Sequence, residues 1–247
     1  MNSQKTPISY LKSPKHIVGI IGGMGPEATA SLFSKIIEKS KKFVKVDQDH
    51  FRVIIDSNPK IPDRTQFIIG KGSNPLPSII ETAKNLEQAG VTIGVIPCMT
   101  SHFFIGEIQS AVSYPIMNAY TETDKYIKKH FVNVTKIGVL STTGTKVTKL
   151  FNMYLTDFGI LYPSKEFQEN KVMEAIYGKD GIKKGNTGIK NKNLLIQASN
   201  ELINKGAEII ITGCTEIPLV LKEDMLSVPI VDPMDVVAES LIANLQV

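Results

Sequence analysis

The stretch Gly90-Val-Thr-Ile-Gly-Val-Ile-Pro-Cys98 decides the fold, because the chain repeats its plan at Gly206-Ala-Glu-Ile-Ile-Ile-Thr-Gly-Cys214. In both stretches the glycine precedes the cysteine by eight positions, and the residues between them are mostly apolar. A short apolar run rich in isoleucine and valine is typical of a parallel strand buried on both faces. Each stretch therefore predicts a buried strand that leads into a cysteine.

The repeat extends to segments on either side of these two stretches. Upstream, Lys15–Gly22 resembles Lys136–Ser141, and downstream Pro115–Asn118 matches Pro229–Asp232. A strand, a cysteine turn and an x-Pro-Ile-x-Asx strand thus follow each other twice in the same order. Two similar α/β halves, each with one cysteine at the end of a strand, are the simplest account.

Short β-branched runs alternate with longer segments of helical periodicity. The expected strands are 16–21, 51–56, 91–97, 135–140 and 208–212, and the expected helices are 28–40, 77–90, 121–131 and 193–206. This alternation predicts an α/β fold with parallel sheets covered by helices on both faces. We expect a flexible tail at 1–14, a first half at 15–118, a second half at 119–232, and a C-terminal helix at 233–247 that packs back on the first half.

The composition is that of an ordinary globular protein, with 42% hydrophobic and 21% charged residues in a chain of 247. A chain of this length buries a core large enough to fold without a disulfide or a metal. The net charge is only +4 and the lysines are scattered, which favours solvated faces over a nucleic-acid surface. No apolar run reaches membrane-spanning length, and the start of the sequence lacks the apolar core of a signal peptide. With two cysteines in the sequence, we expect a cytoplasmic protein with reduced thiols.

Cys98 and Cys214 are the leading candidates for chemistry. Ligands of parallel α/β sheets bind beyond the carboxyl ends of the strands, where both cysteines are expected. A helix that begins after each cysteine would favour its thiolate through the helix dipole. The alternative is a cysteine buried as a small hydrophobic side chain, but that interpretation does not account for two cysteines at equivalent positions of a repeat.

Two thiols suit a reaction that inverts a stereocentre. Inversion removes a proton from one face of a carbon and adds a proton to the opposite face, and two groups of similar basicity can do this in both directions. A free thiol has a pKa of about 8.5, so modest tuning leaves one thiolate and one thiol at neutral pH. Two halves that face each other across a cleft would place one cysteine on each side of the carbon.

Three turns at expected strand ends are candidates for ligand contacts. The glycine turn Gly22-Gly-Met-Gly-Pro-Glu-Ala-Thr29 opens a helix; it could hold a carboxylate, be purely structural, or bind a dinucleotide through its Gly-x-Gly-x-x-Ala spacing. Arg64 could form a bidentate pair with a substrate carboxylate, or a surface pair with Asp63. The hydroxyl-rich turn Ser141–Thr145 suits carboxylate or amine recognition, or a plain helix cap.

His102 and Lys183 complete the set of candidate residues. His102 follows Cys98 by four residues, so on a helix the two would share a face, and His102 could polarise the thiol. Lys183 lies in a polar loop, where composition alone predicts a solvated lysine. The other histidines form no ligand spacing with either cysteine, so we expect no metal site.

Three of these motifs together resemble the aspartate/glutamate racemase family. They are the turn 22–29, Pro97-Cys98-x-Thr100-x-His102, and Gly213-Cys214-Thr215-Glu216-Ile-Pro218. The resemblance runs from about His16 to the C-terminus. It implies two Rossmann-like halves related by pseudo-two-fold symmetry with the active site in the cleft between them. It also implies racemisation of an amino acid by two cysteines without PLP or another cofactor, and a homodimer.

The resemblance further implies roles for individual residues. Cys98 and Cys214 would be catalytic, with His102 and Glu216 supporting them. The substrate contacts would be Met24, Gly25, Arg64, Met99, Thr100, Thr142, Thr145, Lys183 and Thr215. Lys183 is placed in this set through a single Lys-x-Gly match.

One position departs from the family pattern. Aspartate-type members carry Cys-Asn-Thr-Ala-His, whereas this chain has Cys98-Met99-Thr100-Ser101-His102. Methionine offers soft apolar contact in place of an amide, which predicts a reshaped pocket, a larger substrate or relaxed specificity, while Arg64 favours a distal carboxylate. We therefore expect a racemase of aspartate or glutamate. The alternatives are a broad-specificity racemase, an isomerase or decarboxylase of a small diacid, and a non-catalytic protein that binds a small ligand.

Overall fold

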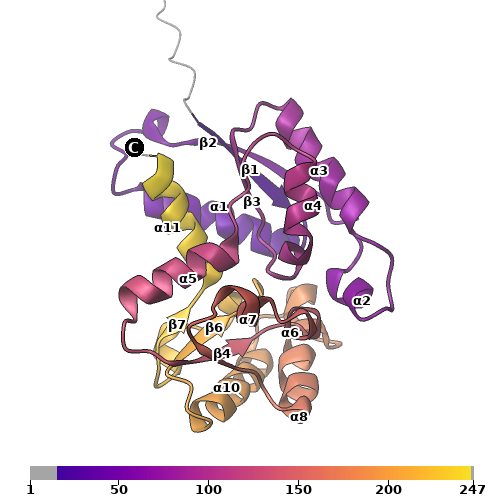
Figure 1. Cartoon of the computed structure of the whole chain (residues 1–247), viewed down its shortest axis with the longest axis vertical. Helices are drawn as coiled ribbons and strands as arrows, with labels where there is room; N and C mark the ends of the chain where they lie inside the picture. Colours follow the sequence, from indigo (N-terminus) through magenta and orange to yellow (C-terminus); the bar gives the residue numbers. More distant parts are fainter. Residues whose placement is uncertain (1–15, 246–247) are drawn as a thin grey trace, which may run out of the picture.

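The computed structural model describes residues 16–245, so the expected tail at 1–14 lies outside the described residues. Two parallel sheets organise this part of the chain, one in each half, and Figure 1 shows them one above the other. Within residues 16–245, no helix combines the length and the apolar character needed to cross a membrane.

The five expected strands are present, each within a few residues of its predicted bounds. The strands are β1 Ile17–Gly22, β2 Arg52–Ser57, β3 Ile93–Val95, β4 Lys136–Leu140, β5 Gly159–Leu161, β6 Ile209–Thr212 and β7 Ile230–Val231. The first sheet has the order β2-β1-β3 and the second has the order β5-β4-β6-β7, with every neighbouring pair parallel. The α/β class with two parallel sheets, predicted from the alternating pattern, is confirmed.

The two sheets share one plan, as the sequence repeat predicts. In the second sheet, the Ile210 amide donates to the Pro229 carbonyl at 2.9 Å, which joins β7 to β6. The same bond recurs in the first sheet, where the Gly94 amide donates to the Pro115 carbonyl at 2.8 Å and Ile116 forms a parallel bridge to Gly94. The two sheets therefore have the same order of strands. In the first sheet, the place of the fourth strand is taken by Ile116, which forms a single parallel bridge.

The helices begin where local signals place them. Pro26 opens α1 in the first turn, where its missing N–H costs nothing. The Asn118 side chain caps α5 by accepting from the Tyr120 amide at 3.0 Å. The helices are α1 Pro26–Ser40, α2 Arg64–Ile68, α3 Leu76–Gln88, α4 Ile105–Ser110, α5 Ala119–His130, α6 Thr143–Thr148, α7 Leu150–Tyr154, α8 Lys165–Phe167, α9 Glu174–Tyr177, α10 Ile189–Asn204 and α11 Pro233–Leu245. Turns of 3₁₀ or π geometry occupy Asp47–Asp49, Thr100–Phe104, Gln168–Met173, Ile182–Lys184, Ile217–Leu219 and Glu223–Met225.

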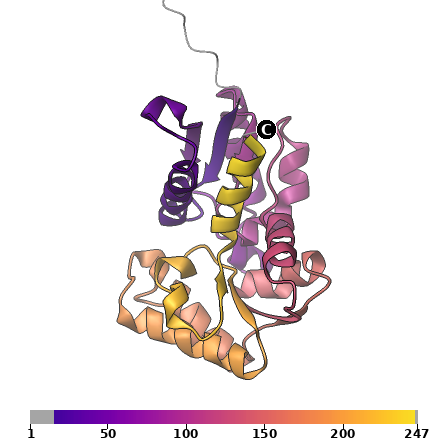
Figure 2. The ribbon, with the colours of Figure 1, turned by 90° about the vertical axis from the view of Figure 1, so that its left-hand side faces the viewer.

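Helix α11 leaves the second sheet and packs against α1 and α5. Figure 2 shows it rising from the second half alongside the first. Lys35 of α1 pairs with Asp232 at 3.0 Å, and Lys39 pairs with Asp235 at 2.6 Å. These contacts agree with a C-terminal helix that returns to the first half, although the exact boundaries between the halves stay a prediction.

One buried apolar cluster runs through both halves. It contains Val18 and Ile20 of β1, Val139 of β4 and Ile211 of β6, together with Leu241 of α11. Burial of aliphatic side chains of this size stabilises a fold by about 1.5–3 kcal/mol for each residue. The two halves are therefore packed on a common core, and the ends of their strands are held close to each other.

Candidate active site

The thiols of Cys98 and Cys214 line one closed cavity of about 10 Å³. Cys98 follows the end of β3 and Cys214 follows the end of β6, so one thiol comes from each half. Each cysteine is 5% exposed. The residues that line the cavity are Met24, Arg64, Thr65, Cys98, Met99, Thr100, Thr142, Tyr177, Lys183, Cys214, Thr215 and Glu216. A volume of this size holds about one water molecule, so the walls of the cavity have to move apart before a substrate can lie between the two thiols.

The structure brings nearly all of the residues predicted for the site to this cavity. The exceptions lie next to it. Gly25 lines the adjoining vestibule, the Thr145 hydroxyl contacts that of Thr100, and the His102 ring contacts the Cys98 carbonyl. Thr65 and Tyr177 also line the cavity, and the sequence analysis missed both. Thr65 adjoins Arg64 in the sequence, a signal that could have found it. Tyr177 lies in a segment that has no counterpart in the repeat.

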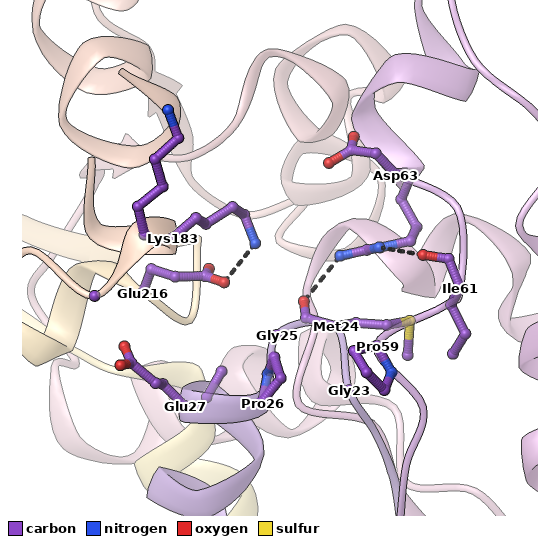
Figure 3. A pocket seen from close by; sticks show the side chains of 14 residues that line it. Gly23, Met24, Gly25, Pro26, Glu27, Pro59, Ile61, Asp63, Lys183 and Glu216 are labelled. Carbon is purple, nitrogen blue, oxygen red and sulfur yellow. Dashed lines mark hydrogen bonds and ion pairs between the residues drawn. The ribbon is translucent and has the colours of Figure 1, made fainter. Parts of the chain in front are cut away.

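An outer vestibule of about 600 Å³ lies against the closed cavity (Figure 3). Four residues line both spaces and so form the boundary between them: Met24, Arg64, Lys183 and Glu216. The remaining walls of the vestibule are Gly23, Gly25, Pro26, Glu27, Ala28, Pro59, Ile61, Asp63, Lys184 and Gly185. The vestibule, unlike the inner cavity, has room for a small molecule.

The glycine turn after β1 positions one wall of the site. Gly23 has a φ of +89°, and a Cβ there would lie 2.3 Å from the backbone of Asn58, so the turn requires glycine. The turn aims the Met24 carbonyl at Arg64, whose Nη2 donates to it at 2.9 Å. The turn thus has a structural role and also forms part of the site.

Arg64 is a buried residue, 7% exposed, so the alternative of a surface pair with Asp63 is wrong. Its Nη1 donates to the Pro62 carbonyl at 3.1 Å, while Asp63 accepts instead from the Tyr177 hydroxyl at 2.9 Å. Among residues 16–245, Arg64 Nε has no hydrogen-bond partner. Burial lowers the pKa of Arg64, but the negative charges that Cys98 and Asp63 carry when ionised raise it, and the pKa ends above its ordinary value. Arg64 is therefore a permanent cation with a free donor on the wall that it shares with Cys98.

Threonine hydroxyls join the two halves across the cavity. Thr142, in the turn after β4, accepts from the Thr65 hydroxyl at 3.1 Å, and its hydroxyl lies 3.1 Å from that of Thr100. Thr100 also contacts Thr145 at 2.9 Å, and Thr142 caps α6. On the opposite side, the Thr215 hydroxyl donates to the Pro97 carbonyl at 3.3 Å. The turn at 141–145 therefore serves both as a helix cap and as a polar wall.

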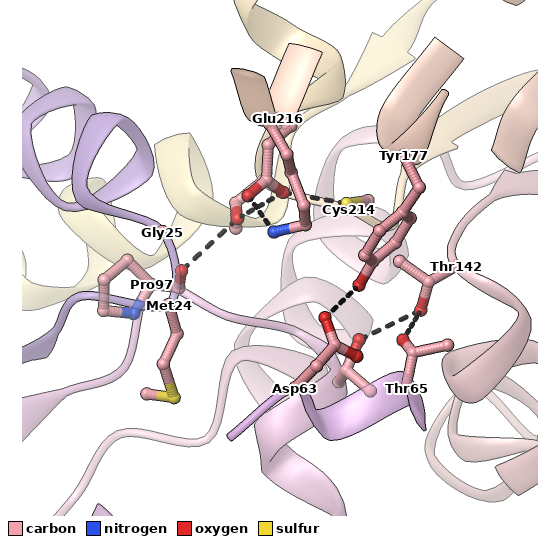
Figure 4. Close-up of polar contacts among 12 residues, drawn as sticks. Met24, Gly25, Asp63, Thr65, Pro97, Thr142, Tyr177, Cys214 and Glu216 are labelled. Atoms are coloured by element: carbon pink, nitrogen blue, oxygen red, sulfur yellow. Dashed lines mark hydrogen bonds and ion pairs between the residues drawn. The ribbon is translucent and has the colours of Figure 1, made fainter. Parts of the chain in front are cut away.

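Cys214 sits beside a carboxylate. Its Sγ donates to Glu216 Oε2 at 2.9 Å (Figure 4), and the other oxygen of Glu216 pairs with Lys183 Nζ at 2.5 Å. Lys183 is thus not a solvated loop lysine, because its side chain is 20% exposed and ion-paired. Burial, and then the charge of Glu216, raise the pKa of Cys214 well above its ordinary value. The expectation that a helix dipole favours this thiolate is wrong, because the following turn, Ile217–Leu219, is only three residues long.

His102 does not polarise the Cys98 thiol. Its Nε2 accepts from the Ala119 amide at 3.2 Å, so the ring proton is on Nδ1, which donates to the Cys98 carbonyl at 2.9 Å. Burial lowers the pKa of His102 to about 4. His102 is a neutral side chain that holds the backbone of the cysteine turn in place.

Acid should destabilise the fold through His102. The unfolded chain binds a proton at a pKa of about 6.5 and the folded chain only at about 4, so stability is complete above pH 6.5 and falls between pH 6.5 and pH 4. The expected loss over this interval is about 3 kcal/mol. Urea unfolding at pH 7 and pH 5 should show about 2 kcal/mol of this loss, because pH 5 lies within the interval. A His102→Gln variant, whose amide can make both hydrogen bonds but does not titrate, should lose less; an equal loss in both proteins would show that another group is responsible.

A family model described as Asp/Glu/Hydantoin racemase matches residues 21–241, which is most of the chain. The chain belongs to this family. It is a racemase and therefore an isomerase, and this membership favours an enzyme over a non-catalytic binding protein.

Relatives within and around the family cover nearly the whole chain. The broad-specificity amino-acid racemase of Bacillus subtilis (strain 168) is 29% identical over 232 residues, which cover 92% of this chain and 97% of that protein. The aspartate racemase of Picrophilus torridus has the same fold, with a TM-score of 0.77, 24% identity and 94% of each chain covered. An aspartate racemase homologue from Pyrococcus horikoshii has a TM-score of 0.73 and 25% identity over 94% of this chain and all of that one (100%).

Met99 occupies the position where the family pattern has asparagine. Its side chain is 1% exposed and belongs to the apolar cluster that contains Tyr120 and Phe151. The Met99 carbonyl accepts from the Tyr120 hydroxyl at 3.3 Å. Met99 also lines the cavity beside Cys98, as does Met24. The wall at this position therefore lacks the amide that asparagine would supply.

Proposed function

We propose that this protein racemises a small amino acid by proton transfer at Cα between two thiols, Cys98 and Cys214. The observation that supports this proposal is the position of one thiol from each half on a single closed cavity. In either direction, the cysteine that is a thiolate removes the Cα proton and the other cysteine, as a thiol, adds a proton from the opposite face. This chemistry needs no bound cofactor.

Removal of the Cα proton places negative charge on the substrate carboxylate, and the cavity has groups to stabilise it. Arg64 offers its free Nε, Lys183 offers an ammonium, and the threonine hydroxyls on the cavity wall offer further donors. Donors fixed in a closed site stabilise a developing anion more than water does. We propose that Arg64 and Lys183 bind the carboxylates of the substrate.

Aspartate or glutamate is the first substrate that we propose, because a distal carboxylate would match this pair of cations. A broad-specificity amino-acid racemase is the second candidate. Met99 favours it, since methionine in place of asparagine removes a hydrogen-bonding group from the cavity wall and so makes no demand for a polar group on the substrate. The name of the Bacillus subtilis relative is in keeping with this second candidate.

A panel of amino acids in D₂O tests the function and separates the two candidates. Each enantiomer of the common amino acids is incubated with the protein, and chiral chromatography and proton NMR follow inversion and Cα deuteration. We expect inversion accompanied by solvent deuterium, with aspartate and glutamate leading. Similar rates for several neutral amino acids would favour broad specificity. Absence of inversion for every member of the panel would contradict the proposal.

Two further parts of the proposal concern the setting in which the enzyme works. Both cysteines must stay reduced for this chemistry, so we infer that the protein acts in the reducing cytoplasm. We also propose that it is a homodimer. Light scattering on the purified protein measures its mass directly, and a mass near the 27.1 kDa of one chain would contradict the dimer.

A further inference from the structure

The two thiols have different charged neighbours. Cys214 donates to the Glu216 carboxylate at 2.9 Å, and Glu216 is held in turn by Lys183 (Figures 3 and 4). The charged neighbours of Cys98 on the cavity wall are the cations Arg64 and Lys183. A carboxylate can accept and release a proton at the thiol beside it, whereas a guanidinium stays protonated.

Glu216 also connects the closed cavity to the open vestibule. Cys214 lines only the inner cavity of about 10 Å³, whereas Glu216 and Lys183 line both that cavity and the vestibule of about 600 Å³. Glu216 is 4% exposed, and its Oε2 lies 3.3 Å from the Thr215 hydroxyl, whose one proton is shared between this carboxylate and the Pro97 carbonyl. One oxygen of the carboxylate thus faces the thiol while the other is held by a lysine on the vestibule wall.

A two-thiol racemase has to be reset after every turnover. When Cys98 has taken a proton and Cys214 has given one, Cys98 is a thiol and Cys214 is a thiolate, the reverse of the starting state. The same enantiomer can react again only after Cys98 has lost its proton and Cys214 has regained one. A cavity with room for about one water gives the thiolate little direct contact with solvent.

We propose that Glu216, positioned by Lys183, is the proton relay between the vestibule solvent and Cys214, an inference that rests on the proposed two-thiol mechanism. Vestibule water gives a proton to the Glu216 carboxylate and becomes hydroxide, and the carboxylic acid then protonates the Cys214 thiolate through the 2.9 Å contact. The hydroxide is neutralised by the proton that Cys98 releases. The products are the Cys214 thiol, the Cys98 thiolate, the original carboxylate and water. The reverse sequence takes the proton from Cys214 to solvent.

The charges around the pair suit this direction of transfer. Burial and the charge of Glu216 raise the pKa of Cys214, so its thiolate takes up a proton readily. Burial alone would raise the pKa of Glu216, but the charge of Lys183 and the hydrogen bonds at both oxygens lower it below its ordinary value. Glu216 therefore returns to the carboxylate once it has passed its proton on.

The test separates the reset from the chemical step. The rate constant kcat includes the reset, whereas kcat/KM is measured at low substrate, where the free enzyme has time to reset before it binds. In Glu216→Gln we expect kcat to fall by roughly 10²-fold and kcat/KM to change by less than about fivefold. Glu174→Gln, which neutralises an exposed carboxylate paired with Lys190, is the matched control and should leave both constants unchanged.

Two further readouts keep the test independent of folding. In Glu216→Ala, added formate should enter the space of the missing side chain and raise kcat with little effect on kcat/KM. In the second readout, Glu216→Gln is first equilibrated with a labelled racemate, and an excess of one unlabelled enantiomer is then added. The ratio of the two labelled enantiomers should move transiently away from one. The reason is that a slow reset leaves the enzyme in the form that reacts with the opposite enantiomer.

Two outcomes would overturn the relay. One is that kcat and kcat/KM fall in proportion in Glu216→Gln, with no displacement of the label and no rescue of Glu216→Ala by formate. The other is that Glu216→Gln keeps the wild-type kcat. Both of these outcomes leave the racemase function intact, because wild-type turnover is measured alongside. A wild-type protein that inverts no amino acid would overturn the proposed function and the relay together.

Discussion

Replacing either Cys98 or Cys214 with alanine should lower the rate of racemisation by roughly 10²- to 10⁴-fold, the usual contribution of a positioned acid or base. The two losses should be of similar size, because each turnover needs one cysteine to remove a proton and the other to supply one. Chiral chromatography of the product at saturating substrate measures the effect. A single variant with unchanged racemisation would contradict the pairing of the two thiols.

Each of these variants should keep half of the reaction. With Cys98 alone, the enzyme can remove the Cα proton from the enantiomer whose C–H faces that thiol and return deuterium to the same face. With Cys214 alone, the opposite enantiomer should exchange. NMR of each enantiomer in D₂O should therefore show exchange without inversion, with opposite preferences in the two variants. The same preference in both variants would show that the thiols do not face opposite sides of Cα.

Loss of folding is separated from loss of chemistry by a matched variant. Ser199 is fully buried in α10, outside the cavity, and its hydroxyl donates to the Leu195 carbonyl at 2.8 Å. Ser199→Ala is a truncation of similar size to cysteine to alanine, and we expect it to keep the wild-type kcat. Melting temperatures of the cysteine variants should lie close to that of this control.

Replacing Arg64 with methionine should lower kcat/KM for aspartate or glutamate by roughly 10- to 10²-fold, because a hydrogen bond to a charged group contributes about 1.5–3 kcal/mol. Methionine fills a similar space but has neither the charge nor the donors. If Arg64 binds the distal carboxylate, a neutral amino acid that the wild type accepts should lose much less. Steady-state kinetics with both substrates measure the difference.

The Arg64 result needs a control for structure, because the guanidinium also holds the carbonyls of Met24 and Pro62. Arg64→Lys keeps the charge and one donor group but not the two-pronged geometry of the guanidinium. It should recover part of the lost kcat/KM if charge is the main contribution. Equal losses for the diacid and the neutral amino acid in Arg64→Met would assign Arg64 to the α-carboxylate and contradict its proposed role in specificity.

Much of the fold could be predicted because its central strands, β1, β4 and β6, are buried on both faces. A strand such as Ile209–Thr212 has to be apolar throughout, which leaves a clear pattern in the sequence. The equal spacing from glycine to cysteine then placed both thiols at equivalent strand ends. The segment between β4 and α10 could not be predicted in the same way, because its helices are three to six residues long and too short for periodicity to show.

The site was less predictable where it depends on contacts between distant residues. Tyr177 reaches Asp63 across 114 positions of sequence, and neither residue type indicates this partner. The polar composition around Lys183 predicts a solvated lysine. Only the fold shows that its side chain is largely buried and paired with Glu216. The role expected for His102 was wrong for a similar reason, since helical spacing brought it near Cys98 but the Ala119 amide determined which ring nitrogen carries the proton.

The unequal neighbours of the two thiols, Arg64 beside Cys98 and Glu216 beside Cys214, also have a thermodynamic consequence. Two enantiomers have the same free energy in water, so kcat/KM has to be equal in the two directions for this chain and for every variant of it. The asymmetry can change KM and kcat only together, so the enantiomer with the lower KM also has the lower kcat. Any lasting excess of one enantiomer in a cell must therefore come from other reactions, which either form that enantiomer or consume the opposite one.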